Sequence, residues 1–99
     1  MPDHPLSTLR RIDPEFMEEL SKLEGFVYED GALPRKVKLL IALAFDAAHG
    51  AEEGVRALSR SAMEQGATKQ EIAEVLRVAY HLAGVGSLYT AASGMRDMG

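Results

Sequence analysis

The fold is decided by residues 34–66, PRKVKLLIALAFDAAHGAEEGVRALSRSAMEQG, which predict two helices joined at His49-Gly50. The first helix contains seven consecutive apolar residues, 39–45, and so has almost no polar face. A helix of this kind has to be covered by other helices. The second helix is amphipathic and ends before Gly66, a residue suited to the left-handed turn after a helix. The stretch therefore predicts a helical hairpin at the centre of an all-α domain.

Further helices are predicted on both sides of the hairpin by their start signals. Asp13 and Pro14 form a cap followed by proline at the first helical position. Thr68 is followed three residues later by Glu71, which is the pattern of a capping box. No stretch shows the alternation typical of strands. These signals indicate a compact bundle of about five helices.

The length and composition narrow the class of protein. Ninety-nine residues predict one domain over 1–99, with a loose tail over 1–10 because this part contains two prolines. A net charge of −4 with scattered basic residues predicts no nucleic-acid partner. The longest apolar run is seven residues, whereas a membrane span needs about 20. We therefore predict a cytoplasmic protein with no membrane contact.

Cysteine is absent from the chain. Disulfides, thiolate metal sites and thiol-based redox chemistry carried by this chain are therefore excluded.

Three ionisable residues near the hairpin junction are candidate catalytic groups. Asp46 and His49 are three positions apart on one helix, so they share a face. Glu53 lies in the first turn of the next helix, where the helix dipole favours a negative charge. If the hairpin brings them together, His49 is a general acid/base oriented by Asp46 or Glu53. A second interpretation is a metal ion bound by these three residues. A third is purely structural: His49 caps the end of its helix, and Glu53 belongs to a solvated first turn of the next helix.

Three basic residues are candidate substrate-binding groups. Arg56 and Arg60 lie four positions apart on one helix face, where they can hold a carboxylate or phosphate or form a solvated surface. His81 lies on a later helix and faces a pocket or makes a partly buried hydrogen bond.

Five short motifs follow one another along the chain: DGALP at 30–34, KLLIALA at 38–44, GAT at 66–68, EIAEVL at 71–76 and AGV at 83–85. In this order and spacing they resemble the carboxymuconolactone decarboxylase and alkylhydroperoxidase D-like family. The resemblance covers roughly residues 12–95. It implies an all-α, alkylhydroperoxidase D-like fold and assembly with copies of the same chain as a homotrimer or homohexamer.

The resemblance also locates the reactive positions of the family. In its peroxidase branch, the Cys-x-x-Cys pair falls on Ala51 and Gly54, a Glu falls on Leu39 and a His falls on Leu58. All four residues are inert here, so thiol peroxidase activity is excluded for this chain alone. The decarboxylase branch also lacks the cysteines and is similar over residues 50–53, but its His is likewise missing near Leu58.

Two functions follow as predictions. The first is cofactor-independent acid/base chemistry on a small carboxylate or lactone, with His49, Asp46 and Glu53 as catalytic residues. This predicted reaction needs neither a metal ion nor a cofactor. The second is a non-catalytic binding or assembly module that keeps the fold after losing the reactive residues.

Overall fold

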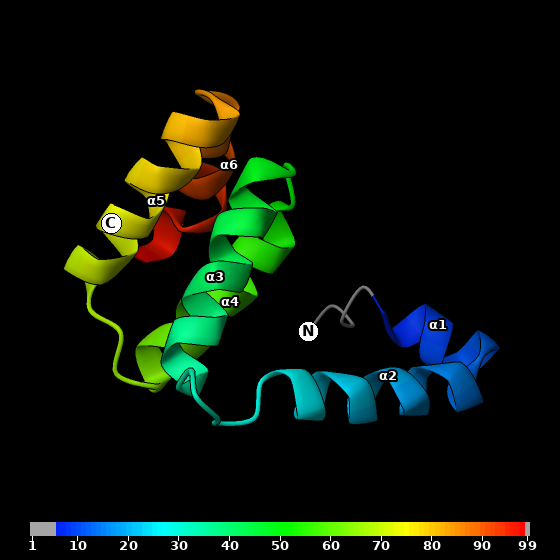
Figure 1. The fold of residues 1–99 in the computed structure, drawn as a ribbon. Coiled ribbons are helices and arrows are strands. Elements are labelled where there is room, and N and C mark those ends of the chain that lie inside the picture. The colour runs from blue at the N-terminus through cyan, green and yellow to red at the C-terminus, as the bar shows by residue number, and fades with distance from the viewer. Residues whose placement is uncertain (1–5, 99) are drawn as a thin grey trace.

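The computed structural model describes residues 6–98, which form six α-helices and a closing 3-10 turn (Figure 1). No strand occurs among these described residues, and the predicted all-α fold is confirmed. The elements are α1 (Ser7–Ile12), α2 (Pro14–Val27), α3 (Arg35–Ala48), α4 (Glu52–Glu64), α5 (Lys69–Ala83), α6 (Gly86–Gly94) and the 3-10 turn η1 (Arg96–Met98).

The predicted hairpin is formed by α3 and α4 and lies at the centre of a body made of α3 to α6. Gly50 makes the turn between the two helices with a φ of 79°, a conformation that side chains rarely adopt. Leu43 of α3 and Val55 of α4 are fully buried between them. Helix α6 crosses α4 so closely at Gly94 that no Cβ would fit there. The apolar hairpin therefore supplies most of the core.

The predicted helix caps are present. Asp13 accepts a hydrogen bond from the backbone N–H of Phe16 at 3.2 Å. Thr68 and Glu71 form the capping box in both directions, at 3.0 and 2.9 Å. The backbone N–H of Thr68 and then the Lys36 ammonium, 3.1 Å away, hold the pKa of Glu71 below its usual value. The start of α5 is thus fastened to α3 by an anionic Glu71.

Helices α1 and α2 pack on each other and form an arm that projects from the body (Figure 1). Helix α1 is not predicted by the sequence, which indicates a loose tail over residues 1–10. Residues 7–10 of that range belong to α1, and residues 1–5 lie outside the described residues.

The elbow, residues 28–34, joins the arm to the body and is held by the first turns of α3. The Lys38 ammonium donates to the Glu29 carbonyl at 2.6 Å. The Arg35 backbone N–H donates to the Asp30 carboxylate at 2.6 Å, and its guanidinium donates to the Tyr28 carbonyl at 3.5 Å. These bonds fix the direction in which the arm leaves the body.

The expectation that α3 is covered on all sides is wrong for this single chain. Ile41 is 45% exposed and Phe45 is 60% exposed, because α4, α5 and α6 leave one edge of α3 open. Across residues 6–98, no helix has both the length and the apolar character needed to cross a membrane.

Candidate functional site

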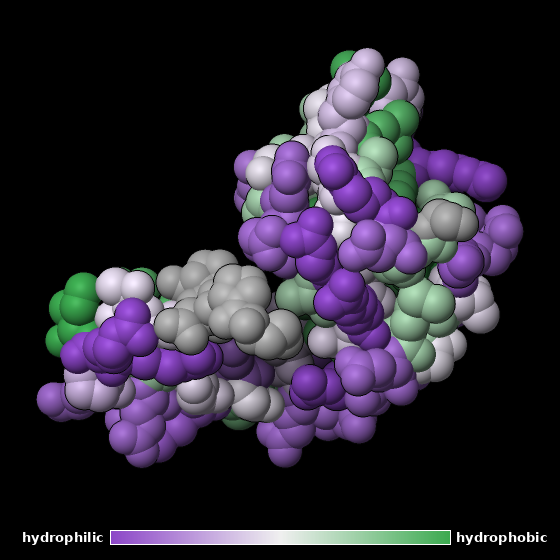
Figure 2. Space-filling model, turned by 180° about the vertical axis from the view of Figure 1, so that it is seen from behind, coloured by the Kyte–Doolittle hydropathy of each residue, from purple (hydrophilic) through white to green (hydrophobic). Residues whose placement is uncertain are grey.

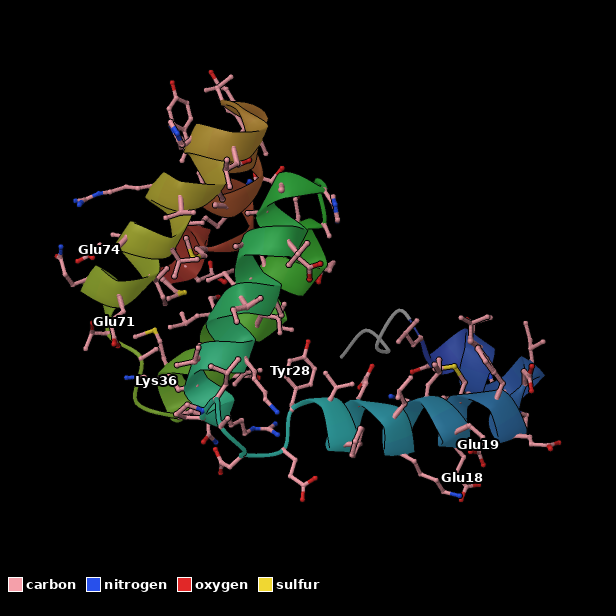
Figure 3. The ribbon with its side chains drawn as sticks, viewed as in Figure 1. Glu18, Glu19, Tyr28, Lys36, Glu71 and Glu74 are labelled. Atoms are coloured by element: carbon pink, nitrogen blue, oxygen red, sulfur yellow. The ribbon has the colours of Figure 1, made fainter. Side chains whose placement is uncertain are left out.

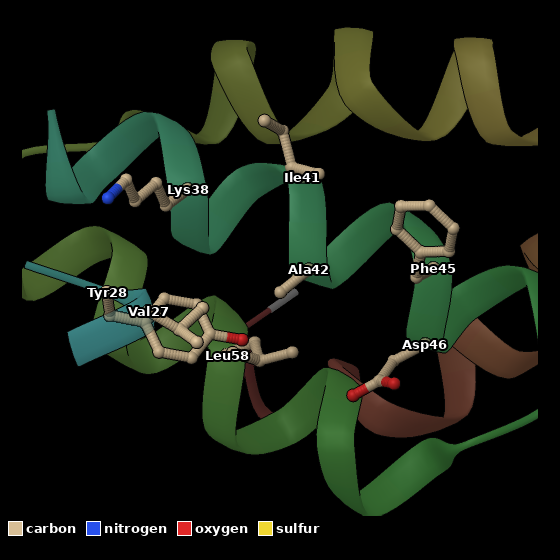
Figure 4. A pocket seen from close by; sticks show the side chains of 8 residues that line it. All are labelled: Val27, Tyr28, Lys38, Ile41, Ala42, Phe45, Asp46 and Leu58. Atoms are coloured by element: carbon tan, nitrogen blue, oxygen red, sulfur yellow. The ribbon is translucent and has the colours of Figure 1, made fainter. Parts of the chain in front are cut away.

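A pocket of about 500 Å³ lies beside the elbow, against one face of α3 (Figure 4). Helix α3 supplies most of the lining because positions 38, 41, 42, 45 and 46 fall on one helix face. The end of α2, the first residue of the elbow and the middle of α4 contribute the other lining residues, and the pocket is open to solvent. The volume is within the range of small-molecule sites. The lining residues are Val27, Tyr28, Lys38, Ile41, Ala42, Phe45, Asp46 and Leu58.

The polar groups of the pocket are separated by apolar walls. Lys38 and Asp46 lie eight residues apart on α3, which corresponds to about 12 Å along the helix. The Tyr28 hydroxyl lies between them, beside Leu58 (Figure 4). The pocket therefore offers a cation at one end, a carboxylate at the other and an apolar surface between.

The position of the Asp46 side chain depends on a glycine in the neighbouring helix. A Cβ at Gly54 would lie 2.7 Å from the Asp46 carboxyl carbon and would overlap its Oδ2 oxygen. The missing side chain therefore lets the carboxylate rest on the first turn of α4, where the helix dipole favours a negative charge. Asp46 is half-buried there.

The three predicted catalytic residues are not joined by hydrogen bonds or ion pairs. His49 is exposed, and its ring centroid lies 6.0 Å from that of Phe45. Glu53 instead pairs with Arg56 at 2.6 Å. Within the described residues, no three His, Asp or Glu side chains form a group able to hold a metal ion. Of the three, only Asp46 lines the pocket.

The three predicted substrate-binding residues lie outside this pocket. Arg56 is engaged by Glu53, and the Arg60 guanidinium lies 3.6 Å from the Asp97 carboxylate. His81 is exposed in the last turn of α5. Their roles in substrate binding stay predictions.

Two polar residues of the pocket are absent from the predicted site. Lys38 lies seven and eight positions before Phe45 and Asp46, and this helical spacing is the signal that would have placed it on their face. Tyr28 has no comparable signal, because the direction of the elbow brings it to the pocket.

Comparison of the sequence with known protein families gives a match over most of the chain. The model of the carboxymuconolactone decarboxylase family matches residues 14–96. The chain belongs to the carboxymuconolactone decarboxylase family. An uncharacterized protein of Methanocaldococcus jannaschii, MJ1511, is 33% identical over 85 residues, which are 86% of this chain and 79% of that protein.

A solved structure supports the same assignment. The crystal structure of apo-lpg0406, a carboxymuconolactone decarboxylase family protein from Legionella pneumophila, is 33% identical in sequence and has a TM-score of 0.84. The match covers 92% of this chain and 81% of that one.

In this carboxymuconolactone decarboxylase family chain, two positions that the resemblance assigns to reactive residues lie at or next to the pocket. Leu58, at the position that the resemblance assigns to the histidine of the family, lines the pocket. Gly54, at the position of a cysteine, lies under Asp46. Of the four positions that the resemblance assigns to reactive residues, 39, 51, 54 and 58, Leu58 alone lines the pocket.

Proposed function

We propose that the protein binds a small carboxylic acid with an apolar body in the pocket beside the elbow. The observation that carries this proposal is the Lys38 ammonium at one end of an apolar surface, about 12 Å along α3 from the Asp46 carboxylate at the other end (Figure 4). An ammonium has three donors, and Lys38 uses one of them on the Glu29 carbonyl. The remaining donors can hold a carboxylate by charge-assisted hydrogen bonds, while Ile41, Phe45 and Leu58 contact the apolar part.

Binding without chemistry accounts for the inert residues at the reactive positions. Leu58 extends the apolar wall, which favours an apolar ligand and offers no proton-transfer group. His49 is exposed and has no hydrogen bond to Asp46 or Glu53 that would orient it.

Replacing Lys38 by methionine is expected to weaken the binding of benzoate, used as the probe. Loss of a hydrogen bond to a charged group costs about 1.5–3 kcal/mol, so the dissociation constant should rise roughly tenfold or more. The measurement is an NMR titration that follows the backbone amides of α3.

Two further variants make this test specific. Lys69→Met removes a lysine that does not line the pocket and should leave the dissociation constant unchanged. Lys38→Arg keeps the positive charge and should retain much of the affinity. Equal binding by Lys38→Met and the unchanged protein would contradict the proposal.

Acid/base chemistry on a small lactone is a second candidate, and the position of Asp46 favours it. Asp46 provides the one carboxylate among the residues that line the pocket. A carboxylate there can take a proton from water as the water attacks the lactone carbonyl. The ester C–O bond then breaks, and the same proton is returned to the leaving alkoxide.

Asp46→Asn is expected to lower the rate of hydrolysis of a small γ-lactone by about 100-fold or more, because a general base is removed. The rate is measured as acid released at constant pH. Glu52→Gln is the matched control, because it removes a carboxylate in the first turn of α4 that does not line the pocket. His49→Gln tests the predicted role of the histidine in the same assay. If Asp46→Asn hydrolyses the lactone as fast as the control, Asp46 is not the base.

A further inference from the structure

A second pocket, of about 400 Å³, lies between the first two turns of α5 and the segment formed by the end of α6 and η1. Positions 69, 72, 73 and 76 share one face of α5 and form one wall. The small side chains of Ala73 and Ala92, one on each wall, leave room between them. The pocket shares no lining residue with the pocket beside the elbow. Its lining residues are Lys69, Ile72, Ala73, Leu76, Ala92, Met95, Arg96 and Met98.

The interior of this second pocket is apolar and adaptable. Ile72 is buried, and Leu76, Met95 and Met98 are half-buried against the core. Methionine has a flexible, polarizable side chain, so the two methionines can adjust to the shape of a ligand. Seen from behind, the side of the body away from the arm shows hydrophobic residues bordered by hydrophilic ones (Figure 2). The pocket therefore favours a ligand with an apolar body.

Two cationic side chains, one from each wall, line the second pocket. Lys69 is the first residue of α5, and Arg96 is the first residue of η1. Within residues 6–98, neither side chain has an ion pair or a hydrogen bond. All the donors of the ammonium and of the guanidinium are therefore available to a ligand.

No carboxylate of the described chain lines the second pocket, since the acidic residues nearby are engaged elsewhere or turned away. Glu71 binds Lys36 of α3 and caps its own helix (Figure 3). Asp97 pairs with Arg60 of α4. Glu74 lies on the outer side of α5 (Figure 3). The charge of the lining is therefore that of two cations, which is complementary to an anion.

We propose that the second pocket binds a phosphate monoester with an apolar body. Such a phosphate carries a charge of about −1.5 to −2 at neutral pH, which matches two cations. Arginine binds phosphate through two parallel hydrogen bonds, and lysine adds a point charge. The apolar group lies against Leu76, Met95 and Met98. A carboxylic acid has a single charge and would leave one of the two cations without a partner.

The probe for this site is hexyl phosphate, titrated while NMR follows the backbone amides of α5, α6 and η1. Each buried CH₂ group tightens binding about fourfold, so methyl phosphate should bind at least about tenfold more weakly. Heptanoate has the same six-carbon chain with a single charge and should also bind several-fold more weakly. Equal binding of methyl phosphate would show a surface anion site only, and equal binding of heptanoate would exclude recognition of a dianion. Either result would overturn the proposal.

Lys69→Met and Arg96→Met each remove one cation and keep a long apolar side chain. Either variant should raise the dissociation constant of hexyl phosphate about tenfold, because a hydrogen-bonded charge is lost. Both residues are exposed and lie outside the core, so circular dichroism should be unchanged. The matched control is Arg77→Met, since Arg77 is an exposed cation of α5 that does not line the pocket. Equal dissociation constants for the three variants would contradict the proposal.

Filling the second pocket tests its apolar part. Ala73→Leu places a larger side chain between the walls and leaves both cations in place. Hexyl phosphate should bind this variant at least about tenfold more weakly, whereas methyl phosphate should lose little affinity. An unchanged affinity for hexyl phosphate would place its chain outside the pocket and overturn the proposal.

The two ligand sites can be tested separately because they share no lining residue. Lys38→Met should weaken benzoate binding and leave hexyl phosphate binding unchanged, and Lys69→Met should do the reverse. A protein that binds hexyl phosphate but not benzoate would contradict the proposed function and support the second site. A protein that binds benzoate but not hexyl phosphate would overturn the second site alone.

Discussion

Replacing Leu43 by alanine is expected to lower the free energy of unfolding by about 3 kcal/mol. Leu43 is 0% exposed at the centre of the α3–α4 hairpin, so the variant loses buried apolar contacts and leaves a cavity that the helices fill only in part. Urea unfolding followed by far-ultraviolet circular dichroism measures the change. For a domain of this size, each kcal/mol corresponds to about 4–8 °C in the melting temperature.

The control for this variant is a leucine with the opposite exposure. Leu82 of α5 is 80% exposed, so Leu82→Ala should change the unfolding free energy by less than about 0.5 kcal/mol. Similar losses for the two variants would show that the hairpin interior does not form the core.

Gly94→Ala is expected to cost about 2 kcal/mol, although alanine is the better helix former. A Cβ at this position would lie 2.7 Å from Val55 Cγ1 and 2.8 Å from the Glu52 carbonyl oxygen. The carbonyl belongs to the α4 backbone and cannot rotate away, so α6 has to move from α4. Thermal unfolding of the purified variant measures the loss.

Gly86→Ala, in the same helix, is the matched substitution. A Cβ on Gly86 meets nothing within 4 Å, so this variant should be as stable as the unchanged protein or slightly more stable. If Gly94→Ala is also neutral, the contact between α4 and α6 tolerates a wider spacing.

Local chemistry accounts for the parts of the fold that the sequence predicts well. Gly50, Thr68 and Glu71 are read correctly because a left-handed turn and a capping box involve neighbours in the chain. The apolar run of residues 39–45 correctly predicts a central helix. It does not show whether that helix is covered by its own chain or by another copy, so the exposed Ile41 and Phe45 are not foreseen.

The candidate site is less predictable because it depends on how elements turn toward each other. Helical spacing places Asp46 and His49 on one face, yet His49 is the exposed residue after the last turn of α3. Glu53 forms its ion pair with Arg56, three residues away on the same helix, and not with a group across the junction. Tyr28 reaches the pocket only through the direction of the elbow, which rests on side-chain bonds from α3.

The contact between Asp46 and Gly54 also has an evolutionary consequence. Any side chain at position 54, a cysteine included, would displace the carboxylate from its place on α4. The two positions are therefore epistatic: a thiol at 54 and the present placement of the carboxylate exclude each other. A mutational path from this chain to a thiol-bearing relative therefore has to move the Asp46 carboxylate, by a new side-chain conformation or by substitution, before or as it gains the sulfur.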